Sequence, residues 1–107
     1  MTFGIIGSGA FGTALSISLS STNKKLILWT RNQDVVNSVQ EIRENRLRLP
    51  GYILPQNIIV TNDINQMENC SIILIAVPMQ QLRSVVELHR SRSVSYTHLR
   101  AHETQLH

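Results

Sequence analysis

FGIIGSGAFG, residues 3–12, is the stretch that decides the fold of this 107-residue chain. Its first four residues form a short apolar run that is long enough for a buried strand. Gly7, Gly9 and Gly12 have the spacing Gly-x-Gly-x-x-Gly, and residues 13–19 then continue as a predicted helix. A strand, a glycine turn and a helix in this order are the context in which this motif binds a diphosphate group.

Each glycine of the motif has a separate physical reason to be there. Gly7 permits the tight turn out of the strand, Gly9 lets the backbone approach a diphosphate, and Gly12 lets the helix pack closely on the strand. The free N–H groups and the positive end of the helix then face the phosphates. The alternative is that the glycines only shape a strand-to-helix turn. The position of the motif directly after the apolar run makes binding the favoured interpretation.

The length and composition predict one small folded domain. A chain of 107 residues has room for no more than one such domain, and 42% hydrophobic with 16% charged residues is typical of a soluble globular protein. The formal net charge is +3, but acidic and basic residues are interleaved and aromatic residues are few. Nucleic-acid binding is not expected, because a clustered basic face with stacking aromatic side chains is missing.

A reducing compartment is predicted because Cys70 is the only cysteine, so no internal disulfide can form. Cys70 is expected to be a small buried hydrophobic residue. The N-terminus lacks the basic and long apolar regions of a signal peptide. The longest apolar run, residues 72–78, is too short to span a bilayer. We therefore predict a cytoplasmic protein with no membrane partner.

Four apolar runs alternate with segments of helical periodicity along the chain. The predicted strands are residues 2–6, 26–29, 58–61 and 72–77, and the predicted helices are residues 10–20, 33–45, 64–68 and 80–89. This βαβαβαβα alternation predicts an α/β fold with a parallel sheet of Rossmann type. Right-handed crossovers make the strand order 3-2-1-4 the natural one. Asn32 or Asp34 is expected to cap the second helix.

The sequence is expected to be truncated after the fourth strand and its helix. In the order 3-2-1-4 the fourth strand is an edge, and it is the most apolar strand of the chain, which is an aggregation hazard. Residues 1–90 are therefore predicted to be an incomplete domain. Residues 91–107 show no strand or helix face and resemble a translated sequencing-adapter tail, so they are expected to be non-native or disordered. His98 and His102 could share a helical face there, but no carboxylate or cysteine completes a metal site.

The end of the second predicted strand bears on the choice between NAD and NADP. An acidic residue there would bond the adenosine ribose, but the sequence has Arg31, whose planar cation suits a 2′-phosphate or stacking on adenine. This favours NADP, or tolerance of both NAD and NADP. Asp34 is the competing ribose ligand, and Arg31 as a solvated loop charge is the alternative. At the end of the fourth strand, Val77 and Pro78 are expected to line the nicotinamide side of the cofactor.

No acid–base group of the chain is predicted to be catalytic. The sequence has no lysine after residue 25 and no histidine before residue 89. In a dehydrogenase the cofactor does the hydride transfer, and the protein supplies orientation and a proton donor. That donor has no candidate here.

Four stretches together resemble NAD(P)-dependent glycerol-3-phosphate dehydrogenase over residues 1–88. They are IGSGAFGTAL (residues 6–15), LWTR (28–31), the group of REN (43–45) with LPG (49–51) and LP (54–55), and AVPMQ (76–80). The resemblance implies reversible reduction of dihydroxyacetone phosphate to sn-glycerol 3-phosphate for glycerophospholipid synthesis. It also implies that a catalytic lysine and a helical substrate-binding domain lie beyond this chain, which would be inactive alone. A homodimer is possible for the full-length protein.

The resemblance adds two residues to the predicted site and shows two departures from the family pattern. By motif position, Ala10 and Phe11 contact the cofactor, and Arg31 lies near the adenosine 2′ position. Ala10 stands where the family often has serine, and Arg48 stands where an aromatic residue commonly precedes Leu-Pro. The predicted cofactor-binding residues are therefore Gly7, Gly9, Ala10, Phe11, Gly12, Arg31, Val77 and Pro78.

Two other functions remain alternatives. One is a different dehydrogenase with a similar amino-terminal half, of the ketopantoate reductase type, against which the Leu-Trp-x-Arg and Leu-Pro-Gly stretches argue. The other is a non-enzymatic nucleotide-sensing module, which the lack of a catalytic residue fits equally well.

Overall fold

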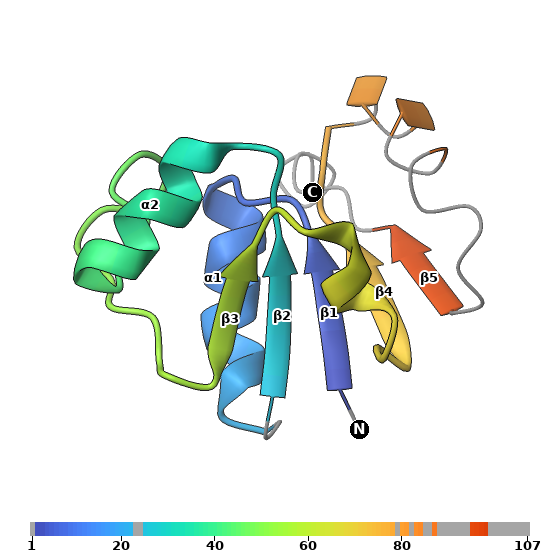
Figure 1. Cartoon of the computed structure of the whole chain (residues 1–107), viewed down its shortest axis with the longest axis horizontal. Coiled ribbons are helices and arrows are strands. Elements are labelled where there is room, and N and C mark those ends of the chain that lie inside the picture. Colours follow the sequence, from blue (N-terminus) through green and yellow to red (C-terminus); the bar gives the residue numbers. More distant parts are fainter. Residues whose placement is uncertain are drawn as a thin grey trace, which may run out of the picture.

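A single parallel sheet forms the centre of the molecule (Figure 1). The computed structural model describes residues 2–22, 25–78, 80–81, 83–84 and 87, and the backbone of residues 95–98. The strands are β1 (Thr2–Ile6), β2 (Lys25–Trp29), β3 (Ile58–Thr61), β4 (Ile72–Ile75) and β5 (Ser95–His98). They lie in the order β3-β2-β1-β4-β5. The predicted Rossmann-type arrangement 3-2-1-4 is thus confirmed, with one strand added at the β4 edge.

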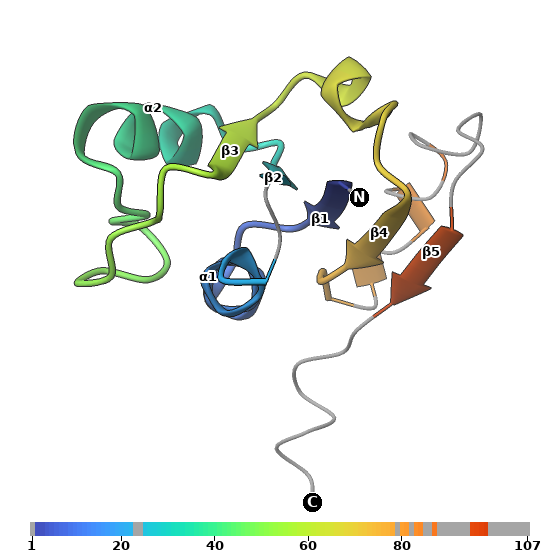
Figure 2. The same cartoon turned by 90° about the horizontal axis from the view of Figure 1, so that it is seen from below.

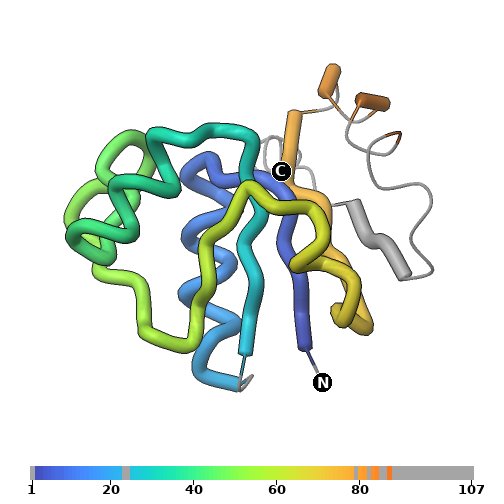
Figure 3. Tube along the Cα trace, viewed as in Figure 1, coloured from blue at the N-terminus to red at the C-terminus, as the bar shows by residue number. Residues whose placement is uncertain are grey.

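Helical segments cover both faces of this sheet (Figure 2). They are α1 (Ala10–Ser20), α2 (Gln33–Ile42) and a short 3₁₀ helix, η1 (Ile64–Met67). The chain between α2 and β3 runs back to the amino end of β3, so that β3 can run parallel to β2 (Figure 3). In the part of the chain that the structure describes, no helix is both long and apolar enough to cross a bilayer.

The alternation of side chains along each strand divides the core into two layers. Ile5 belongs to the layer under α1 and α2, together with Leu28 and Val35. The next residue, Ile6, belongs to the opposite layer, where it packs with Met67 of η1. Ile5, Ile6, Leu28, Val35 and Met67 are completely buried, which explains why the strands read as unbroken apolar runs. The carboxyl end of β1 is therefore held from both sides.

Cys70 lies in the second of these layers and is 3% exposed, as predicted for a small buried hydrophobic residue. Burial raises the pKa of its thiol, and the nearby Lys25 ammonium lowers that pKa by a smaller amount. A buried thiol with a raised pKa is a poor nucleophile. Cys70 is thus a core residue.

Helix α2 ends three residues earlier than its periodicity predicted. Arg43 has φ 56°, a left-handed conformation that is uncommon for a residue with a side chain. Its N–H donates to the Val39 carbonyl at 2.8 Å, and its guanidinium donates to the carbonyls of Pro55 at 2.5 Å and Ile58 at 2.9 Å. These bonds to a distant segment stabilise the left-handed residue and stop the helix. At the other end, Asn32 accepts a hydrogen bond from the Asp34 N–H at 2.9 Å and is the cap.

The carboxyl ends of two other elements also differ from the prediction. β4 ends at Ile75 instead of residue 77, because the neighbouring strand β1 ends at Ile6, which lies opposite Ile75. The helix predicted over residues 80–89 has helical backbone at Gln80, Gln81, Arg83, Ser84 and Glu87. Its other residues lie outside the described part of the chain.

The tail contains a strand that sequence analysis did not predict. Ser95–His98 pairs in parallel with β4, with Ile72 opposite Ser95 and Ile75 opposite His98. The prediction of no regular structure in residues 91–107 is therefore wrong for these four residues. Tyrosine and threonine favour extended backbone, and the open edge of β4 offers its backbone groups for pairing. Residues 91–94 and 99–107, including His102, lie outside the described residues, and the non-native origin of the tail stays a prediction.

Candidate cofactor site

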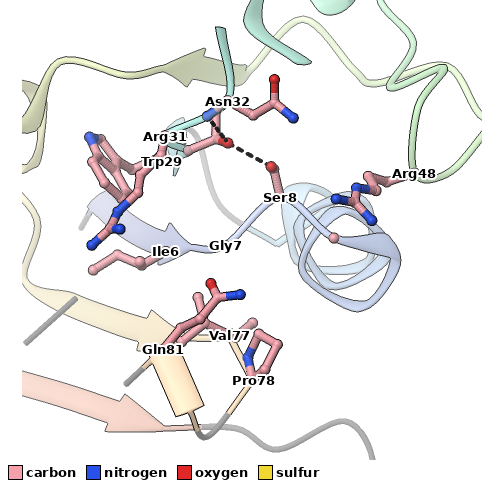
Figure 4. Close-up of a pocket in the computed structure, with 13 residues that line it drawn as sticks. Ile6, Gly7, Ser8, Trp29, Arg31, Asn32, Arg48, Val77, Pro78 and Gln81 are labelled. Atoms are coloured by element: carbon pink, nitrogen blue, oxygen red, sulfur yellow. Dashed lines mark hydrogen bonds between the residues drawn. The ribbon is translucent and has the colours of Figure 1, made fainter. Parts of the chain in front are cut away.

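A pocket of about 290 Å³ opens at the carboxyl ends of β1, β2 and β4 (Figure 4). This is the point where the strand order changes direction between β1 and β4, and ligands of open α/β sheets bind there. The lining residues come from the glycine turn, the end of β2, the loop after α2 and the end of β4. They are Ile6, Gly7, Ser8, Gly9, Trp29, Thr30, Arg31, Asn32, Arg48, Ala76, Val77, Pro78 and Gln81.

Gly7 makes the turn at the end of β1. Its φ of 117° is in a region that side chains rarely adopt, and its N–H donates to the Trp29 carbonyl at 3.0 Å. A Cβ on Gly7 would also lie 2.9 Å from the Ala76 carbonyl carbon. Both the conformation and the close approach of β4 therefore require glycine at this position.

Gly9 has a different environment, because a Cβ there would meet no atom within 4 Å. Gly9 lines the pocket and is also the N-cap of α1, with ordinary extended backbone at φ −66°. It has no side chain to cap the first-turn N–H groups, and the first turn of α1 contains no acidic residue. The space over Gly9 is thus open, and the helix end beside it is electropositive. A diphosphate fits both properties.

Gly12 is buried and lies outside the pocket wall. A Cβ there would clash with the Gly7 carbonyl, being 3.0 Å from its carbon. Gly12 therefore allows α1 to approach the glycine turn. Ala10 is exposed and Phe11 is half-buried, and their side chains do not line the pocket. Their predicted contact with the cofactor stays a prediction, and the groups that they can offer an anion are the backbone N–H groups of the first helical turn.

Hydroxyl groups join the ends of β1 and β2 across the pocket floor. Ser8 Oγ and Thr30 Oγ1 are 2.6 Å apart, and Thr30 Oγ1 also accepts the Asn32 N–H at 3.0 Å (Figure 4). Thr30 is 3% exposed, so this contact fixes the glycine turn against the strand that bears Arg31. Sequence analysis missed Ser8 and Thr30. The available signal was a small hydroxyl residue within two positions of the end of each of two neighbouring parallel strands.

Asn45 is a second residue that sequence analysis missed. It is fully buried, and its Nδ2 donates to the Ser8 carbonyl and to Thr13 Oγ1, each at 2.9 Å. Its Oδ1 accepts the Arg48 N–H at 3.2 Å. One amide side chain therefore fastens the loop after α2 to the glycine turn.

Arg31 is exposed at the mouth of the pocket, where its Nη2 donates to Ser84 Oγ at 3.1 Å. Asp34 is not among the lining residues, because it lies in the first turn of α2. Val77 and Pro78 also line the pocket, and their place on the nicotinamide side of a cofactor stays a prediction. The pocket thus brings together five of the eight predicted residues, Gly7, Gly9, Arg31, Val77 and Pro78, and Arg48 joins them from the loop after α2.

The charge of the pocket wall suits an anion. The lining residues include Arg31 and Arg48 and no aspartate, glutamate, histidine or lysine. Among the residues that the structure describes, no group of histidine, cysteine and acidic side chains could hold a metal ion. The described wall can therefore bind and orient a phosphorylated ligand, and it offers no acid–base group for proton transfer.

Comparisons with known proteins show the family to which the chain belongs. The family model for the NAD-dependent glycerol-3-phosphate dehydrogenase N-terminus matches residues 2–99. The chain is 46% identical over 83 residues to glycerol-3-phosphate dehydrogenase [NAD(P)+] of Roseobacter denitrificans, an alignment that covers 78% of this chain and 26% of that protein. It is 45% identical over 82 residues to the enzyme of the same name from Anaplasma marginale, covering 76% of this chain and 24% of that protein.

A solved structure supports the same assignment. The crystal structure of glycerol-3-phosphate dehydrogenase from Coxiella burnetii superposes with a TM-score of 0.85 and 26% sequence identity. The superposition covers 92% of this chain and 32% of that structure. The chain spans about a quarter of the length of the curated relatives that it matches. Neither alternative function is better supported, and the chain belongs to the family of NAD-dependent glycerol-3-phosphate dehydrogenases, whose N-terminal part it matches.

Proposed function

We propose that this chain is the NAD(P)-binding part of an enzyme that reversibly reduces dihydroxyacetone phosphate to sn-glycerol 3-phosphate. The observation that carries the proposal is the open space over Gly9, which lies beside the uncapped end of α1 in a pocket without carboxylates. The relatives named above are glycerol-3-phosphate dehydrogenases, which supports the substrate pair. A cytoplasmic location is part of the proposal and is supported by the lone, free Cys70. A homodimer of the full-length protein stays a prediction.

The pocket residues have distinct roles in this proposal. The bound cofactor supplies the hydride, and the chain holds and orients the cofactor. Gly9 and the first-turn N–H groups of α1 receive the diphosphate, and Arg31 receives the adenosine end. Val77 and Pro78 present an apolar wall on the nicotinamide side. The hydroxyl contact between Ser8 and Thr30 keeps the two halves of the binding surface in place.

Titration of the 107-residue chain with NADH and NADPH, followed by nicotinamide fluorescence, tests the binding part of the proposal. We expect saturable binding of at least one of the two nucleotides. A folded chain, verified by circular dichroism, that binds neither nucleotide at millimolar concentration contradicts it.

An Arg31→Ala variant is expected to weaken NADPH binding about tenfold and to change NADH binding less than twofold. A hydrogen bond to a charged phosphate contributes about 1.5–3 kcal/mol, and an exposed guanidinium is expected at the lower limit. Arg46→Ala is the matched control, because Arg46 is an exposed arginine outside the pocket wall. If NADPH affinity is the same in both variants, Arg31 has no role at the 2′-phosphate.

The purified 107-residue chain is expected to show no oxidation of NADH or NADPH with dihydroxyacetone phosphate. The described pocket wall has no acid–base group, and the family resemblance places the catalytic lysine outside this sequence. A full-length glycerol-3-phosphate dehydrogenase assayed in parallel provides the positive control. Substrate-dependent turnover by the chain above the background rate would refute the division of roles proposed here.

A further inference from the structure

Arg48 is a second cation of the pocket wall, and it comes from a different element than Arg31. It lies in the loop after α2, whereas Arg31 follows β2. Figure 4 shows the guanidinium of Arg48 turned from its loop toward the glycine turn at the start of α1. Arg31 lies on the other side of Ser8 in the same view. The two arginines therefore lie on different sides of the pocket, where each could contact a different part of an elongated ligand.

The backbone of Arg48 is held in a defined place relative to the glycine turn. Its N–H is shared between the backbone carbonyl of Asn45 at 3.3 Å and the Asn45 side-chain oxygen at 3.2 Å. The same buried Asn45 side chain donates to the carbonyl of Ser8, inside the Gly-x-Gly-x-x-Gly motif. A single residue thus connects the backbone of Arg48 to the turn that borders the open space over Gly9.

Acidic residues near this loop do not compete for Arg48 within the pocket. Glu44, the nearest acid in sequence, accepts the Gly51 N–H on its Oε2 at 3.0 Å and is not part of the pocket wall. The Glu44 backbone carbonyl in turn accepts a hydrogen bond of 2.6 Å from Ser38 Oγ. The cation of Arg48 is thus available to an anion in the pocket.

We propose that Arg48 donates a charge-assisted hydrogen bond to the diphosphate of the bound dinucleotide, on the side opposite the N-terminus of α1. The inference rests on the proposed function of the pocket. A guanidinium presents several N–H donors in a planar fork that matches phosphate oxygens. The family resemblance places an aromatic residue at this position, so the contact is a feature of this chain. It adds a side-chain donor to a motif that otherwise holds the diphosphate with backbone N–H groups.

The experiment uses two small probes that separate the two phosphate groups of NADPH. ADP-ribose contains the diphosphate without a 2′-phosphate, and adenosine 2′-monophosphate contains the 2′-phosphate without a diphosphate. Each is titrated in competition with NADH against the wild-type chain and the variants Arg48→Gln, Arg48→Lys and Arg46→Gln. Arg48 is exposed and its described hydrogen bonds come from its backbone, so the substitutions are expected to leave the melting temperature unchanged.

Arg48→Gln is expected to weaken the binding of ADP-ribose, NADH and NADPH by the same factor, about five- to tenfold. The same substitution should leave the affinity for adenosine 2′-monophosphate unchanged. Arg48→Lys should recover part of the loss, and Arg46→Gln should behave as wild type. The loss should shrink in 1 M salt, because a charge pair at an exposed site is screened there.

Two outcomes overturn the inference while the proposed function stands. In one, Arg48→Gln binds ADP-ribose as tightly as wild type. In the other, the loss is confined to NADPH and adenosine 2′-monophosphate, which assigns Arg48 to the 2′-phosphate. The failure of the proposed function looks different, because the wild-type chain would then bind none of NADH, NADPH and ADP-ribose.

Discussion

A Gly9→Val variant of this chain is expected to lose affinity for NADH and NADPH by about 100-fold or more while it folds normally. The valine side chain would point into the open space over Gly9, where a Cβ meets no protein atom within 4 Å. The diphosphate would then be kept from the first-turn N–H groups of α1. Hydrogen bonds to a charged group contribute about 1.5–3 kcal/mol each, so the loss of two accounts for the factor of 100.

The folding half of this prediction follows from the backbone of Gly9. Its φ of −66° is ordinary for any residue, so a side chain causes no strain there. Ala14→Val is the matched control, because it enlarges the side chain at an exposed position of the same helix outside the pocket. Melting temperature and nucleotide titration are measured for both variants. Normal cofactor binding by a folded Gly9→Val chain would show that the open space over Gly9 is not the diphosphate site.

The order of the strands could be predicted because it depends on local patterns. Each of the first four strands is an apolar run, helical segments separate these runs, and the glycine motif follows β1. If the crossover connections are right-handed, this alternation makes 3-2-1-4 the natural order of the strands in the sheet. β5 was missed because Ser95–His98 has no apolar face, and the pairing depends on the free edge of β4, which lies more than twenty residues earlier in the chain.

The parts of the site that could not be predicted depend on contacts between distant segments. Ser8 and Thr30 are 22 positions apart, and Asn45 reaches Ser8 over 37 positions. The end of α2 depends in the same way on Arg43, whose guanidinium reaches the carbonyl of Ile58 over 15 positions. Periodicity within a helix carries no information about such partners. Gly7 and Gly12 were predictable because each of them meets a requirement of the turn itself, whereas Gly9 was predicted from the spacing of the motif.

A Gly12→Ala variant is expected to lose about 2 kcal/mol of folding free energy, because overpacking a tight contact costs up to about 3 kcal/mol and helix propensity returns about 1 kcal/mol. For a domain of this size that loss lowers the melting temperature by roughly 8–16 °C. The added Cβ would clash with the Gly7 carbonyl, and its distance to the carbonyl carbon would be 3.0 Å. Because the obstacle is backbone of the turn after β1, it cannot rotate away, and α1 would have to move off the sheet.

Helix propensity acts in the opposite direction and makes the test decisive. Gly12 lies inside α1, where alanine is more favourable than glycine by about 1 kcal/mol. If propensity dominated, the variant would be more stable than wild type. The cost of the contact with the Gly7 carbonyl is expected to be about three times the gain in helix propensity. Gly9→Ala is the matched control, since the same change meets open space and should leave the melting temperature within a few degrees of wild type. Thermal unfolding of a Gly12→Ala chain at or above the wild-type temperature would contradict the close approach of α1 to the glycine turn, on which the position of the diphosphate site depends.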